Sequence, residues 1–322
     1  MEFKHAFHVF VDNFSTTYKL LVYRLITLAI TIGLSCAVLV PAVGCIADTV
    51  QYTALKTSFS TLWSDIFALN LENLQTSADA VKSASGAFKG MLSDKSWLVA
   101  VVAVCMCAVF FIDRFMVNVG NYVTGALIHD KMVMHTNTPF TYTLFKNIKK
   151  ACLYSIIYTP IAFVYDALCL VIMWAIISMG FKGLSVTLIK IFLVAILFLV
   201  FSAVKYTFIT DWLPSLIHSK MNNGKAIAYT FLRKGKRTGA VLSNALVLKL
   251  IVFALNVAAG LFTFGAGLLL TMPASSLILL SYNFVNYFDA NEYKYFVDAY
   301  TVIGPKKDAP VSREEFFRGE DD

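Results

Sequence analysis

Six long apolar segments constrain this chain more than any other feature of its sequence. A helix needs about 20 apolar residues to cross the roughly 30 Å hydrocarbon core of a bilayer. Hydrophobic residues make up 58 % of the chain and charged residues 15 %, which excludes an ordinary water-soluble domain. The sequence therefore predicts an all-α, polytopic membrane protein, whose six transmembrane helices cover residues 20–46, 97–127, 151–181, 184–204, 241–261 and 266–287.

The distribution of Lys and Arg predicts the orientation of these helices. Residues 205–237 hold seven basic residues and one acid, and residues 113–150 hold five basic residues and two acids. Residues 47–96 hold four lysines and five acids. Since basic loops remain on the cytoplasmic side, both termini are expected in the cytoplasm of a plasma-membrane protein. Residues 1–288 then form one membrane domain, and residues 289–322 form a cytoplasmic tail.

The outer segment 47–96 is too patterned to be a plain linker. Apolar residues recur in it near helical spacing, among polar ones. We expect two amphipathic helices here, which form a small extracytoplasmic cap.

A short repeat lies in the two basic loops. Residues 127–132 read Leu-Ile-His-Asp-Lys-Met and residues 216–221 read Leu-Ile-His-Ser-Lys-Met, so His129 and Lys131 correspond to His218 and Lys220. A Tyr-Thr pair and a basic cluster follow each copy; the clusters are Lys146, Lys149, Lys150 and Arg233, Lys234, Lys236, Arg237. The pattern predicts three transmembrane hairpins, each preceded by an interfacial amphipathic helix; the aromatic N-terminal segment takes this role for the first hairpin.

This arrangement resembles a bacterial family. Interfacial aromatic helices, three hairpins and the Tyr142-Thr143 and Tyr229-Thr230 pairs before basic clusters are similar to uncharacterised six-helix membrane proteins related to the membrane domain of glycerophosphodiester phosphodiesterases. The soluble catalytic domain of that enzyme has no counterpart in this chain. The resemblance implies a role near lipid or envelope metabolism, without defined chemistry.

Charged residues within the apolar segments are the main candidates for function, because each costs roughly 2.5–3.5 kcal/mol at mid-membrane. Asp166 and Lys249 lie at similar predicted depths and can pair if their helices are neighbours. Such a pair serves either a polar substrate cavity or relay, or helix packing alone.

The second apolar segment carries further polar residues. Asp113 and Arg114 point about 100° apart on a helix, so each needs its own partner. Arg114, Asn118 and Asn121 share one face, which suits an interhelical interface or a water-filled vestibule.

The repeated histidines leave several roles open. His129 and His218 are consistent with symmetric ligands, proton sensors, lipid-phosphate contacts or ordinary interfacial residues. No Cys/His spacing typical of zinc sites, nucleophile elbow, phosphate-binding loop or dinucleotide motif occurs, so we expect no metal, no cofactor and no enzymatic activity.

Two functional hypotheses follow. The first is translocation of a small solute or lipid through a polar cavity between helices. The alternative is a non-catalytic scaffold or partner subunit for another membrane or envelope protein. In both cases the net charge of +7 reflects membrane topology and contact with anionic lipids at the cytoplasmic face, and no nucleic acid is expected as a partner.

Overall fold

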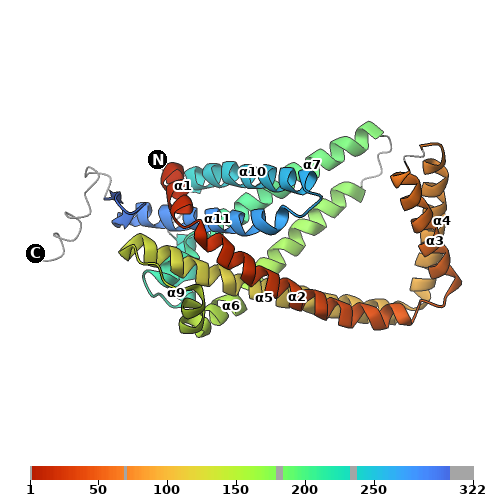
Figure 1. The fold of residues 1–322 in the computed structure, drawn as a ribbon, viewed down its shortest axis with the longest axis horizontal. Helices are drawn as coiled ribbons and strands as arrows, with labels where there is room; N and C mark the ends of the chain where they lie inside the picture. The colour runs from red at the N-terminus through yellow and green to blue at the C-terminus, as the bar shows by residue number, and fades with distance from the viewer. Residues whose placement is uncertain (1, 69–70, 179–183, 233–237, 305–322) are drawn as a thin grey trace, which may run out of the picture. The chain divides into compact units, whose positions relative to one another are not determined.

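The structure, a computed structural model, describes residues 2–68, 71–178, 184–232 and 238–304. Almost all of them are helical (Figure 1), which confirms the all-α prediction. The elements are α1 (Glu2–Asp12), α2 (Ser15–Gly44), α3 (Val50–Phe67), α4 (Leu71–Asp94), α5 (Ser96–Met134), α6 (Phe140–Ser178), α7 (Leu184–Ile209), α8 (Trp212–Ile217), α9 (Asn223–Leu232), α10 (Thr238–Phe262), α11 (Leu268–Asn291), β1 (Tyr295–Phe296) and β2 (Val302–Ile303).

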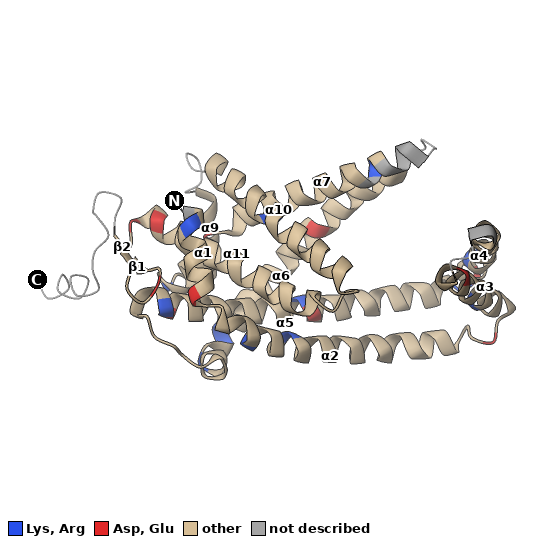
Figure 2. Cartoon of the chain, turned by 45° about the horizontal axis from the view of Figure 1, so that its top comes forward, with Lys and Arg blue, Asp and Glu red and all other residues tan. Residues whose placement is uncertain are grey.

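Six helical segments are long and apolar enough to cross a membrane: α2, α5, α6, α10, α11 and the segment Phe192–Ile217, which runs from α7 to the end of α8. Charged residues are sparse along them (Figure 2). The chain is therefore a multi-pass membrane protein by length and composition.

Each spanning helix extends beyond its predicted segment at one end at least, and three of these differences change the interpretation of the sequence. Helix α5 continues to Met134, so the first copy of the repeat lies inside it. Helix α6 begins at Phe140 rather than near residue 151, because its amphipathic start runs directly into the apolar part. Helix α7 continues to Ile209, which places Lys205 in a helix rather than in a cytoplasmic loop.

The chain divides into two compact units, residues 27–113 and a unit built from residues 1–26 and 114–322. The first of these contains α3 and α4, which pack along each other (Figure 1). Thr49 begins α3, where its hydroxyl accepts a hydrogen bond from the backbone N–H of Tyr52 at 3.4 Å. Ser77 of α4 donates to Asp65 of α3. The prediction of two helices between the first and second spans is confirmed.

Helix α11 is the centre of the larger unit. From Leu277 to Phe288 most of its side chains are buried, including Tyr282, Phe284 and Tyr287. Helices α1, α8 and α10 all pack against it. Pro273 lies within α11, but the helix is continuous from Leu268 to Asn291. The sixth span is thus the least apolar of the six and the most buried.

Residues after α11 pack back onto the N-terminus. The two short strands β1 and β2 pair antiparallel. The hydroxyl of Tyr295 donates to Asp289 at 2.8 Å and lies 3.2 Å from Nδ1 of His5 on α1. This network holds α1 along α11.

Helices α2 and α5 approach each other closely at a glycine within the larger unit. The Tyr23 hydroxyl donates to the backbone carbonyl of Met116 at 2.7 Å. A Cβ added at Gly120 would lie 2.5 Å from Cε1 of Tyr23 and 2.9 Å from its Cδ1. Only glycine leaves room for the ring there.

We therefore expect Gly120→Ala to lower the free energy of unfolding by roughly 1–3 kcal/mol, since the ring must move to accept a methyl group. The measurement is the thermal unfolding midpoint of the purified protein in a neutral detergent. Gly33→Ala in α2 is the matched control, because a Cβ at Gly33 meets nothing within 4 Å. Equal midpoints for the two alanine variants would contradict the close approach.

Candidate functional site

The structure places an ion pair within the apolar helices of the larger unit. Both carboxylate oxygens of Asp166 on α6 accept hydrogen bonds from Nζ of Lys205 on α7, at 2.8 and 2.7 Å. The Lys205 side chain is 22 % exposed, whereas that of Asp166 is 50 % exposed. Half of the Asp166 side chain is therefore not covered by other parts of the protein.

Lys249 on α10 lies in the same group of charges but is not the partner of Asp166. Its ammonium lies 5.2 Å from the ring centre of Tyr206, and it is within electrostatic reach of Lys205 and Asp166. Helix α7 packs against both α6 and α10. A lysine on the intervening helix therefore reaches Asp166 first, and the pairing considered from sequence is replaced by Asp166–Lys205.

Two tyrosines complete this intramembrane charge cluster, which we define as Asp166, Lys205, Lys249, Tyr165 and Tyr206. Nζ of Lys205 lies 6.0 Å from the ring centre of Tyr165. The Tyr165 hydroxyl donates to the carbonyl of Phe201 at 2.9 Å, and that of Tyr206 donates to the carbonyl of Leu279 at 2.6 Å. Each lysine thus lies over one aromatic ring, an arrangement that stabilises a desolvated cation.

Sequence reasoning missed Lys205 and both tyrosines. The apolar pattern predicts that the fourth span ends at residue 204, which places Lys205 in the basic loop. The signal that identifies it is the apolar and aromatic sequence after it, Tyr206 to Ile209, which continues the helix by another turn.

The polar residues predicted to share one face of α5, here called the polar stripe (Arg114, Asn118 and Asn121), contact other helices. Asn118 is buried and donates to Thr159 of α6 at 3.0 Å. Asn121 accepts from Arg24 of α2 at 3.4 Å, and Arg24 also donates to Ser276 of α11 at 3.3 Å. Arg114 lies within electrostatic reach of Tyr158 on α6. The stripe is therefore engaged in an interhelical interface.

Asp113 belongs to the smaller unit. It accepts a hydrogen bond from the Thr31 hydroxyl of α2 at 3.1 Å. It therefore has its own interhelical partner, as the sequence indicated.

A second polar site forms where the two copies of the repeat meet. Nε2 of His129 lies 3.1 Å from Nδ1 of His218, so one imidazole donates and the other accepts. Rings of α11 and of the chain after it surround the pair, with centroid distances of 4.8 Å from His218 to Phe288 and 4.5 Å from His218 to Tyr293. Sequence similarity indicated both histidines, but only the fold brings them together.

The lysines of the repeat have different surroundings. Lys131 forms an ion pair with Asp12 at the end of α1, at 2.9 Å. Lys220 is exposed and follows α8 with a left-handed backbone, φ 49°. The two copies are thus not equivalent in local structure, because the first lies inside α5 and the second ends a short helix.

The basic clusters are only partly described. Lys146, Lys149 and Lys150 are exposed on the first turns of α6, and Lys146 lies 5.6 Å from the ring centre of Tyr142. The second cluster, Arg233, Lys234, Lys236 and Arg237, lies outside the described residues.

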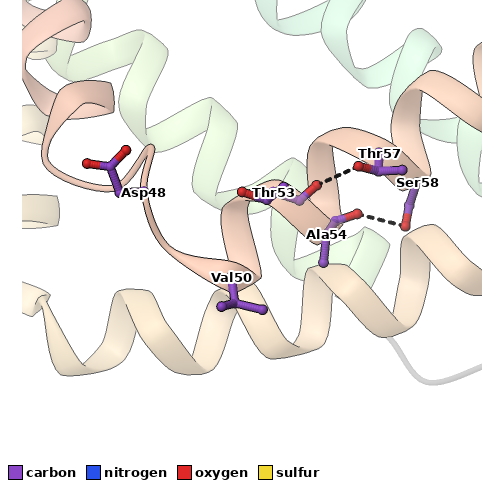
Figure 3. A pocket seen from close by; sticks show the side chains of 6 residues that line it. All are labelled: Asp48, Val50, Thr53, Ala54, Thr57 and Ser58. Carbon is purple, nitrogen blue, oxygen red and sulfur yellow. Dashed lines mark hydrogen bonds between the residues drawn. The ribbon is translucent and has the colours of Figure 1, made fainter.

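The smaller unit has an open hollow at the start of α3 (Figure 3). Its lining hydroxyls bond to their own helix: Thr57 donates to the carbonyl of Thr53 and Ser58 to that of Ala54. These groups are thus already satisfied. Within the described ranges, no three His, Cys, Asp or Glu residues are grouped so that they could hold a metal ion.

Comparison with protein-family models, curated proteins and solved structures finds no match to this chain. The intramembrane charge cluster and the histidine pair are therefore interpreted from their geometry alone.

The histidine pair predicts a dependence of stability on pH. Burial, and then the neighbouring His129, lower the pKa of His218 from its ordinary value of 6.5. The other titratable groups around the pair are Asp130, 3.5 Å from His129, and the phenols of Tyr287 and Tyr293. Because the fold favours neutral His218, its stabilisation is complete above pH 6.5 and is lost as the pH falls below that value toward the folded pKa.

We expect the thermal unfolding midpoint in detergent to fall by a few °C between about pH 7.5 and about pH 5.5. His218→Gln should reduce this fall. Burial also lowers the pKa of His5, and this residue contributes the remainder of the fall in the midpoint. His8→Gln, at an exposed position, is the control. If the unfolding midpoint falls equally at acid pH in the His218→Gln and His8→Gln variants, the histidine pair is not the cause.

Proposed function

We propose that this multi-pass membrane protein translocates a small solute or lipid through a polar cavity bordered by α6, α7 and α10. The observation that carries the proposal is the half-exposed Asp166 within an apolar helix. An ionised carboxylate is expensive against acyl chains, so its exposed side is expected to face water or another polar group. A purely structural ion pair has no need of that exposure.

We also propose where the protein lies in the cell and that it is not an enzyme. We assign the protein to the plasma membrane with both termini in the cytoplasm, because the basic loops favour this orientation. Because the sequence contains no nucleophile elbow, phosphate-binding loop, dinucleotide motif or zinc-site spacing, we assign it no enzymatic activity. The resemblance to the six-helix relatives of the phosphodiesterase membrane domain is consistent with a substrate from lipid or envelope metabolism.

A scaffold role is the second candidate, and the cap favours it. Helix α3 has no buried residue, and it exposes Phe59, Trp63 and Phe67 at 54, 61 and 73 %. Trp63 and Phe67 lie edge to face, with ring centres 5.2 Å apart. Exposed aromatic side chains outside a bilayer are typical of a surface that binds another protein.

Water accessibility at position 166 separates the two candidates. In a cysteine-free chain, Asp166→Cys should react with a membrane-impermeant thiosulfonate at least about tenfold faster than Leu168→Cys, since only a hydrated thiol ionises. Leu168 is the matched control because it lies on the same helix, is 60 % exposed and is apolar. Equal, negligible labelling of two folded variants would reject the cavity and favour the scaffold role.

The proposed anionic-lipid contact has its own test. Neutralising Arg233, Lys234, Lys236 and Arg237 together should weaken retention of phosphatidylglycerol by at least about tenfold, because each basic group near a leaflet contributes about 1 kcal/mol. The measurement is the phosphatidylglycerol bound per protein after purification in a neutral detergent. Neutralising Lys56, Lys82, Lys89 and Lys95 in the outer segment is the control for charge number. Unchanged retention in the first variant would reject the contact.

A further inference from the structure

The intramembrane charge cluster carries one more cation than anion. Asp166 supplies one carboxylate, whereas Lys205 and Lys249 supply two ammonium groups. Both oxygens of the carboxylate are already bonded to Lys205. Among the described residues, Lys249 forms no ion pair within 4.0 Å, so its charge is the surplus one.

Among the described residues, the two tyrosines of the cluster do not supply the missing negative charge. The rings of Tyr165 and Tyr206 lie beside the lysines, but both hydroxyls donate to backbone carbonyls. Cation–π contact with Tyr206 at 5.2 Å offsets only part of the cost of removing an ammonium group from water. An anion that enters from outside the chain would compensate this charge.

Lys190 is a membrane lysine that lies at a helix terminus. It lies near the start of α7, and its ammonium donates to the carbonyl of Ile177 at the end of α6, at 3.2 Å. Lys249 lies near the middle of α10, away from both ends of its helix. The two lysines therefore differ in the feature that matters, which is access to a helix terminus.

We propose that the cavity beside Lys249 and Lys205 binds an anionic group, a carboxylate or a phosphate, on the translocated molecule. This inference rests on the proposed function and names the substrate class for it. Lys249 supplies the charge that attracts the anion. Lys205, held by Asp166, lies beside the bound group. Cationic substrates are repelled by the same surplus charge.

The test measures the charge preference of the cavity with a reporter that leaves all three charges in place. Ala162 lies one helical turn before Asp166 on the same face of α6. In a cysteine-free chain, Ala162→Cys is reacted with anionic sulfonatoethyl and cationic trimethylammonioethyl methanethiosulfonate. The two rates are divided by those for a free thiol in solution.

We expect the normalised rate for the anionic reagent to exceed that for the cationic reagent by about tenfold. Adding Lys249→Gln should lower this preference severalfold. Lys190→Gln, the matched lysine control, should leave it unchanged. Labelling without a charge preference, or a preference that survives Lys249→Gln, would overturn the anionic class while leaving a water-filled cavity. No labelling at position 162 or 166 would overturn the cavity, and the inference with it.

Competition identifies the source of the anion. Slower labelling in inorganic phosphate or acetate supports a free anionic solute. Slower labelling with phosphatidylglycerol, but not with phosphatidylcholine, in the micelle supports a lipid headgroup. Protection by none of these anions would overturn binding of an anion at the cluster.

Discussion

The burial of α11 is the constraint on which the larger unit depends. In a bilayer, helices gain little by hiding apolar surface from lipid, so close packing and interhelical hydrogen bonds decide which helix lies inside. Helix α11 supplies both, since most of its side chains from Leu277 to Phe288 are buried and its Ser275 accepts a hydrogen bond from Asn256 of α10 at 3.0 Å. Asn286 donates to Asp211 at 3.2 Å, which ties the start of α8 to this helix.

The position of α11 also accounts for the histidine pair. Helix α5 brings His129 to it, and the chain after α8 brings His218. Phe288 lies beside both rings, with centroid distances of 6.3 and 4.8 Å. The two histidines meet because both segments pack on the same aromatic end of α11. The charge cluster has a different origin, since it depends on α7 lying between α6 and α10.

Much of the architecture could be predicted from the sequence. The six spans, the helical pair α3 and α4 and the functional interest of Asp166 follow from runs of apolar residues and from the cost of a charge among them. The ends of α6 and α7 could not be predicted in this way, because an amphipathic turn that joins an apolar turn leaves no break in the sequence pattern. That error placed Lys205 in a loop and removed the partner of Asp166 from consideration.

The sequence by itself determined the class of protein, because hydrocarbon admits only segments that satisfy their backbone hydrogen bonds internally, and long apolar runs identify them. It also determined which charges lie among those runs. Only the tertiary structure decided how these groups combine: Asp166 with Lys205, Lys249 over Tyr206, and His129 with His218. The reason is that depth along a helix can be counted from the sequence, whereas the neighbours of a helix depend on side-chain packing among all six spans.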